Sequence, residues 1–229
     1  RVLIKEAKEA MDKFESAVKL MIKNGELPPV KFSSEIHEGV PEDVIRDTAK
    51  RINPMLIVMG TRGAERKEEE LIGSVTAELL DSCRYAVLTV PEGTTLRKIT
   101  DFNHIIFFSN LEQEDILAME QLYRLFKDLE VEITIAHIPG KKDRHDAHPD
   151  AIESLLRYCR QHYPGFTFRV EHLRLDSIIE DFKHVALESH VNLIVLPNKK
   201  RNVFVRFFNP SLAHRLLLHA NVPMLVIPV

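Results

Sequence analysis

The feature that most constrains the fold of this chain is an internal repeat. Shifting the sequence by 137 positions aligns its two halves without a gap. The matched positions include the following pairs: Ile57-Val58 with Ile194-Val195, Ser74 with Ser211, and Val90-Pro91 with Ile227-Pro228. A repeat this long indicates two copies of one domain, because the units of solenoid proteins are about 20–50 residues long. The length of 229 residues agrees with two domains of about 100–150 residues each.

The second half alternates strand-like and helix-like segments. Its predicted strands are His104–Phe108, Val131–Ile138, Phe166–Leu173, Leu193–Leu196 and Val222–Ile227. Its predicted helices are Leu111–Leu129, Pro149–Tyr163, Ser177–Glu188 and Ser211–Leu218. Strands that alternate with helices predict an α/β fold with a doubly wound parallel sheet and right-handed crossovers.

The first half supplies only the later elements of this template. They are helix Glu6–Lys23, strand Val30–Ile36, helix Pro41–Ile52, strand Met55–Met59, helix Leu71–Ser82 and strand Tyr85–Val90. Positions equivalent to the first two strands and the helix between them would precede Arg1, so we expect an incomplete first copy and a native chain that begins earlier or has residues left out. The predicted domains are residues 1–93 and 104–229, joined by a short polar linker at 94–103.

A glycine motif follows the apolar run Met55–Met59. Gly60-Thr61-Arg62-Gly63 comes directly after the run, and Gly73-Ser74 follows nine residues later, at the start of an amphipathic segment. Glycine lets the backbone turn tightly and approach a ligand closely, because no Cβ intrudes. A helix N-terminus offers unpaired N–H groups and a partial positive charge, which suit phosphate. The pattern predicts a phosphate cradle, although the glycines could also form only a strand-to-helix connection.

The full spacing Gly-x2-Gly-x9-Gly-Ser after a strand resembles the ATP-binding motif of the universal stress protein family. The flanking segments Leu56–Thr61, Gly73–Thr76 and Glu38–Pro41 are also similar to that family. The resemblance implies two Rossmann-like sheets of five parallel strands in the order 3-2-1-4-5, with ligands at the carboxyl ends of the strands. It also implies a sensing or regulatory role in stress response, with ATP or AMP, and magnesium, as the ligand. The residues that it assigns to the nucleotide are Gly60, Thr61, Arg62, Gly63, Gly73 and Ser74.

The second half has lost this motif. Its equivalents of the three glycines are Pro197, Lys200 and Pro210. Proline has no N–H to donate to a phosphate and fixes φ, so the second half is expected not to bind nucleotide. Asn110 ends a strand where the family usually has an aspartate that faces the nucleotide. Three phenylalanines of the degenerate loop are expected to pack into the vacated pocket, with a partner surface as the alternative: Phe204, Phe207 and Phe208.

The last strand of each copy predicts how the copies assemble. In the family this strand is an exposed sheet edge, which proteins normally cover or pair. Members of the family commonly associate through it, so the resemblance implies an intramolecular pseudo-dimer with a pseudo-twofold axis. Leu88 and Val90 are then expected close to Leu225 and Ile227. Other faces are left for a homodimer of such chains.

Composition excludes several classes of partner. A net charge of −3 without a basic stripe argues against nucleic acid. No apolar run reaches the roughly 18–20 residues that span a bilayer, and no signal peptide is evident. Cys83 and Cys159 lack metal-ligand spacing and are expected to be buried or partly buried thiols in a reducing cytoplasm. Neither a nucleophile–His–acid set nor a Walker motif is evident, so catalysis is not expected. A scaffold that binds no nucleotide and a slow ATP hydrolase stay open as alternatives.

Overall fold

The computed structural model describes residues 2–61, 73–82, 84–94, 98–109, 111–137, 149–173, 177, 180–182, 184–185, 190–198 and 222–229. The chain divides into two compact units, Arg1–Ile45 and Arg46–Val229. The limits given above for two repeat domains, at residues 93 and 104, stay a prediction.

The first unit contains one long helix, α1, at Val2–Lys23. The helix was expected at Glu6–Lys23, and its carboxyl end is at the predicted residue. Gly25 follows with a φ of +77°, and its N–H donates to the Ile22 carbonyl at 3.1 Å. A glycine in this left-handed conformation is a usual way for a helix to end.

The strand predicted at Val30–Ile36 is wrong, because the structure has no strand at these residues. Val30 is 52% exposed and Ile36 is 41% exposed. In the second half the equivalent strand, β5 (Phe166–His172), pairs only with β4 (Val131–His137). Among the described residues, no strand pairs with Val30–Ile36. A strand without a hydrogen-bonded neighbour is not stable in water.

The second unit is built on one mostly parallel sheet of seven strands, in the order β1-β2-β7-β6-β3-β4-β5. Besides β4 and β5, these strands are β1 (Ile57–Gly60), β2 (Val87–Val90), β3 (His104–Ser109), β6 (Leu193–Asn198) and β7 (Met224–Pro228). The strands of the second half follow the predicted order 3-2-1-4-5, since β5, β4, β3, β6 and β7 are neighbours in that sequence. The described residues of the first half contribute β1 and β2, which are parallel to each other.

The two halves share this sheet, so the expectation of two separate sheets is corrected. β2 and β7 pair antiparallel, with Leu88 opposite Leu225. Leu225 is also the repeat equivalent of Leu88, so each residue of this pair faces its own counterpart. Such self-complementary pairing is what a twofold axis produces, and it makes the predicted edge-to-edge contact. The expected proximity of Val90 to Ile227 is wrong, because the antiparallel register carries these two residues away from each other.

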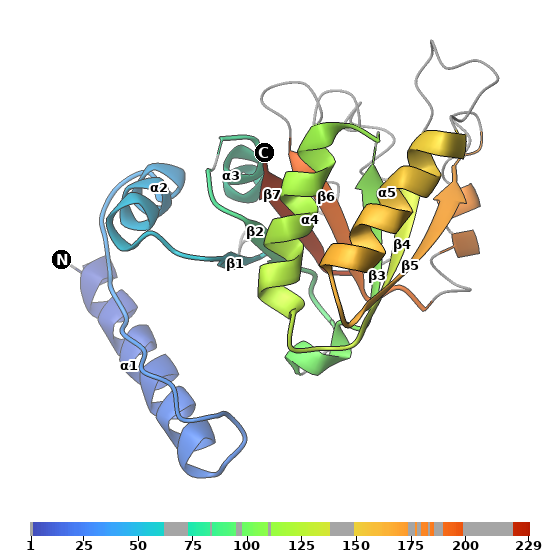
Figure 1. Ribbon diagram of the computed structural model, residues 1–229. Helices are drawn as coiled ribbons and strands as arrows, with labels where there is room; N and C mark the ends of the chain where they lie inside the picture. Colours follow the sequence, from blue (N-terminus) through green and yellow to red (C-terminus); the bar gives the residue numbers. More distant parts are fainter. Residues whose placement is uncertain are drawn as a thin grey trace. The chain divides into compact units, whose positions relative to one another are not determined.

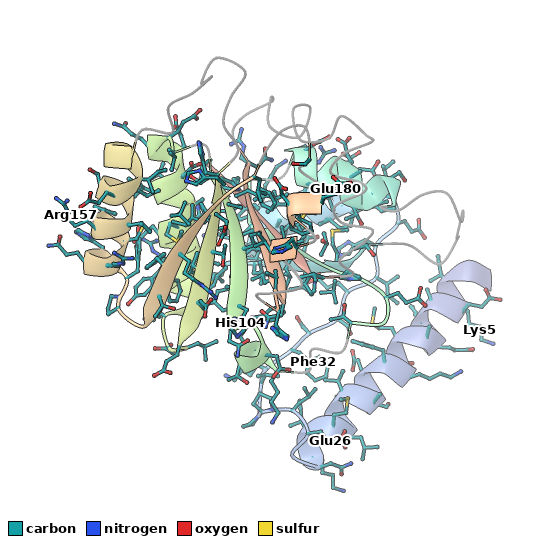
Figure 2. All side chains as sticks on the ribbon, turned by 90° about the vertical axis from the view of Figure 1, so that its right-hand side faces the viewer. Lys5, Glu26, Phe32, His104, Arg157 and Glu180 are labelled. Atoms are coloured by element: carbon teal, nitrogen blue, oxygen red, sulfur yellow. The ribbon has the colours of Figure 1, made fainter. Side chains whose placement is uncertain are left out.

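Apolar side chains cover both faces of the sheet. On one face, alternate residues such as Ile105 and Phe107 pack with Leu122 of α4 (Gln113–Phe126) and with α5 (Pro149–His162). Figure 1 shows α4 and α5 lying across this face. On the other face, Ile106 and Phe108 pack with Phe182 and with Leu80. Figure 2 accordingly shows Arg157 of α5 and Glu180 on opposite sides of the sheet.

The remaining helices agree with their predictions as far as they are described. α2 spans Pro41–Ile52, with the predicted bounds, and α3 spans Ser74–Ser82. Short helical stretches lie inside the helix predicted at Ser177–Glu188, and the helix predicted at Ser211–Leu218 lies outside the described residues.

One predicted cysteine environment is confirmed. Cys159 is a free thiol that is 1% exposed, and burial raises its pKa to about 11. A thiol with so high a pKa is largely protonated at neutral pH and therefore a poor nucleophile. Cys83 lies outside the described residues.

Because β1 lies at the edge of the sheet, the same substitution should have different effects on stability in the two repeat copies. Val58 of β1 is 60% exposed, whereas its repeat equivalent Val195 of β6 is completely buried between β3 and β7. We expect Val195→Ala to lower the free energy of unfolding by about 2–3 kcal/mol, through lost burial and a cavity. Val58→Ala should lower it by less than about 0.5 kcal/mol. Urea denaturation of both variants measures the difference, and equal losses would show that β1 is covered in solution.

Candidate functional site

The described part of the candidate site begins where β1 ends. Gly60 is the last residue of β1 and pairs with Val90, the last residue of β2. The N–H of Thr61 then donates to the Val90 carbonyl at 3.2 Å. Because β1 and β2 are parallel, their carboxyl ends meet at one edge of the sheet, where ligands bind in open α/β sheets.

The start of α3 lies against this edge. The N–H of Gly73 donates to the Thr61 carbonyl at 2.7 Å, and the Gly73 carbonyl accepts from the N–H of Ala77 at 3.0 Å. Gly73 is thus the capping residue of α3, and Ser74 is its first helical residue. The two ends of the predicted motif, Gly60-Thr61 and Gly73-Ser74, are therefore adjacent in space.

Thr76 holds the first turn of α3 in this place. Its hydroxyl donates to the Gly60 carbonyl at 3.1 Å, and the residue is only 4% exposed. Sequence reasoning missed this residue, because a threonine inside a predicted helix usually needs no special explanation. The sequence feature that could have identified Thr76 is its position three residues after the capping glycine. From there a side chain can form a hydrogen bond to the preceding strand.

This arrangement offers donors for an anion. Gly60 and Ser74 are exposed, and Thr61 and Gly73 are half-buried. The first N–H groups of a helix have no partner inside the helix and point along its axis, toward any ligand placed at its start. Ser74 can add its hydroxyl. Arg62 and Gly63, the other two predicted site residues, lie outside the described residues.

Acidic side chains lie at the other end of α3. Burial, with the charge of Glu78, raises the pKa of Asp81. Arg46 of α2 approaches this end, with Nη1 at 3.4 Å from Glu78 Oε1 and 3.1 Å from Ser82 Oγ. The described acidic residues of α3 therefore do not lie at its start. The start is the end of the helix where the dipole favours a bound anion.

The corresponding strand end of the second half is different. Pro197 and Asn198 occupy the positions of Gly60 and Thr61 at the end of β6. The Asn198 side-chain amide donates to the Leu80 carbonyl of α3 at 2.8 Å. Asn110, Lys200, Pro210 and the three phenylalanines of the degenerate loop lie outside the described residues, so their predicted roles stay predictions.

A buried polar network lies where β3 ends. Ser109 Oγ donates to Asp115 Oδ2 at 2.7 Å, and the N–H of Glu112 donates to the same oxygen at 3.2 Å. His137 Nδ1 donates to the Ser109 carbonyl at 3.1 Å, since a carbonyl only accepts. His172 packs edge-on against His137, with ring centroids 5.8 Å apart. The Asp115 carboxylate is only 3% exposed and is bonded within the protein, so it is not directed at a ligand.

Two other kinds of site were searched for among the described residues. Their His, Cys, Asp and Glu side chains form no group of three or more that could hold a metal ion. Within the same part of the chain, no helix combines the length and apolarity needed to cross a membrane.

Comparison with known proteins finds a family match over the first half of the chain and a similar fold over nearly all of it. A universal stress protein of Methanocaldococcus jannaschii is 37% identical over 76 residues, which are 33% of this chain and 45% of that protein. The crystal structure of a universal stress protein from Archaeoglobus fulgidus has a TM-score of 0.70 at 18% identity, covering 98% of this chain and 78% of that one. A functionally unknown protein of Pseudomonas aeruginosa has a TM-score of 0.60 at 13% identity, over 96% of this chain and 77% of its own.

The family model described as "Universal stress protein family" matches residues 3–91, a range that includes the whole glycine motif. The matched stretch of the archaeal relative spans less than half of that protein's length. Because their sequence identities are low, the two crystal structures show a shared fold and no more. The first half of this chain, residues 3–91, is therefore similar to the universal stress protein family, and nearly the whole chain shares the fold of these proteins.

Proposed function

We propose that the first half of this chain binds one adenine nucleotide, ATP or AMP, at the carboxyl edge of β1 and β2. In this proposal the protein is a cytoplasmic sensing or regulatory module of a stress response, and the second half binds no nucleotide. The functional limits are the predicted domains, residues 1–93 and 104–229, with 94–103 as the linker.

The observation that carries the proposal is the junction of the two motif ends. The hydrogen bonds from Gly73 to Thr61 and from Thr76 to Gly60 fix the start of α3 beside the end of β1. A phosphate placed there would meet helix N–H groups and the positive end of the helix dipole. The chemistry of these donors fits a phosphate better than it fits a cation or an apolar ligand.

Each motif residue has a proposed role. Gly60 and Gly63 present backbone N–H groups to the phosphates, and Arg62 supplies positive charge. Thr61 lies between them in the cradle, with its own N–H bonded to the Val90 carbonyl. Gly73 allows close approach, and Ser74 donates its hydroxyl on the ribose-phosphate side. Magnesium, when bound with ATP, would neutralise phosphate charge. Among the described residues no acid cluster could hold the metal without the nucleotide.

Calorimetric titration tests the proposal directly. ATP and AMP, each with and without magnesium, should bind with a stoichiometry of one per chain. No heat of binding at millimolar nucleotide would overturn the proposal and favour the scaffold alternative. A phosphate-release assay on the same samples decides the hydrolase alternative, since steady release of phosphate would show turnover.

A further inference from the structure

The carboxyl end of α3 lies against the second half of the chain. The Leu80 carbonyl is one of the last four of this nine-residue helix, which have no partner inside an α-helix. Asn198 Nδ2 donates to it at 2.8 Å. A side chain at the end of β6 therefore satisfies a helix end that belongs to the other half.

The position of Asn198 in the repeat corresponds to a residue of the candidate site. It is the equivalent of Thr61, which lies in the candidate phosphate cradle of the first half. The antiparallel pairing of β2 with β7 brings the carboxyl end of the second half's strands beside the amino end of β2, where α3 ends. The strand end that lost its glycines thus contacts the helix whose other end carries the intact motif.

Packing supports the same connection. Leu80 is 1% exposed and belongs to a core cluster in which, among the described residues, Val87 is the only other buried member from the first half. The rest come from the second half, among them Phe108, Phe182 and Val226. Leu80 thus places its side chain in a core that the second half mainly builds, and its carbonyl accepts the hydrogen bond from Asn198.

We propose that Asn198 is a positioning residue for the nucleotide cradle, so that the second half serves as the anchor of α3. An isolated helix of nine residues is marginal in water, and contacts at its ends therefore decide its order and position. Thr76 and Gly73 fix the start of α3 to the first half, and Asn198 fixes its end to the second. This inference rests on the proposed function of the first half.

The test is to remove the Asn198 donor. Asn198→Asp keeps the shape but loses the N–H groups, and Asn198→Ala removes the group without adding charge. Losing one hydrogen bond of ordinary net strength should weaken ATP binding about fivefold. Hydrogen exchange of the Ala77–Ser82 amides should become about fivefold faster, whereas exchange in β3 and β4 stays unchanged.

Asn192→Asp is the matched control. Asn192 precedes the same strand, and its side-chain amide donates to Asn103 Oδ1 at 2.7 Å at the other end of β6. The same substitution there should leave α3 exchange and ATP affinity unchanged, even if it lowers the melting temperature.

Two results would separate this inference from the proposed function. Unchanged α3 exchange and unchanged affinity in both Asn198 variants would overturn the positioning role. Wild-type protein that binds no nucleotide would overturn the proposed function, and in that case the exchange of α3 still decides whether Asn198 anchors the helix.

Discussion

Replacing Gly73 with valine is expected to weaken the binding of ATP and AMP by about 100-fold or more. Gly73 caps α3 with its backbone, and its N–H bonds to the Thr61 carbonyl at 2.7 Å. A branched side chain at this junction would occupy the space through which a phosphate approaches the helix start. A loss of about 2.7 kcal/mol in binding free energy corresponds to this factor. Calorimetric titration of the variant with ATP gives the number.

Two further variants check the geometry behind this expectation. Gly63→Val should have a similar effect, because the motif assigns Gly63 a backbone contact with phosphate. Gly73→Ala, with a smaller side chain, should give an intermediate loss. Thermal unfolding of each variant shows whether the fold is retained. Wild-type affinity in a folded Gly73→Val variant would mean that nucleotide does not approach the start of α3.

The second large effect concerns the shared sheet. In a Leu88→Cys/Leu225→Cys variant, the two thiols lie directly opposite each other on β2 and β7. Cα atoms of such an antiparallel pair are about 4.5–5.5 Å apart, within the range that a disulfide spans. Oxidation should form the crosslink and raise the free energy of unfolding by roughly 4 kcal/mol relative to the reduced variant, because it closes a long loop. Urea denaturation with and without reductant measures this difference.

A displaced pair is the control for this crosslink. In the same register, Val90 and Ile227 are about four residues apart along the strand direction, which is roughly 13 Å at 3.3 Å per residue. A Val90→Cys/Ile227→Cys variant should therefore not crosslink under the same conditions. Both variants need Cys83 and Cys159 replaced by serine. Crosslinking of the displaced pair alone would contradict the observed register.

Local signals in the sequence predicted many of the elements correctly. α2 has its predicted bounds because Pro41 suits the first position of a helix, and because Asn53 adopts a φ of +48° directly after the last one. The strand order of the second half was predictable because βαβ units with right-handed crossovers leave few arrangements. The pairing of β2 with β7 was predictable as well, since two exposed apolar edges in one chain can cover each other.

The features that could not be predicted from the sequence depend on contacts between residues that are far apart in the chain. Val30–Ile36 has the composition of a strand, but composition cannot supply the neighbouring strand that its hydrogen bonds require. The exact register at Leu88 follows from the symmetry of the repeat, whereas the predicted proximity of Val90 to Ile227 ignored the antiparallel direction. No local pattern marks Asn198, which follows Pro197, the repeat equivalent of Gly60. Its bond to Leu80 crosses 118 residues of sequence, which no local pattern reveals.

In the proposed function, nucleotide binds to the first half of the chain and not to the second. Titrating ATP into uniformly ¹⁵N-labelled protein and following the backbone amide resonances tests it residue by residue. We expect the largest shifts at Gly60, Thr61, Gly73 and Ser74, with small shifts at the end of β6. Large shifts centred on Asn198 and the end of β6, with none at Gly60 or Gly73, would contradict it.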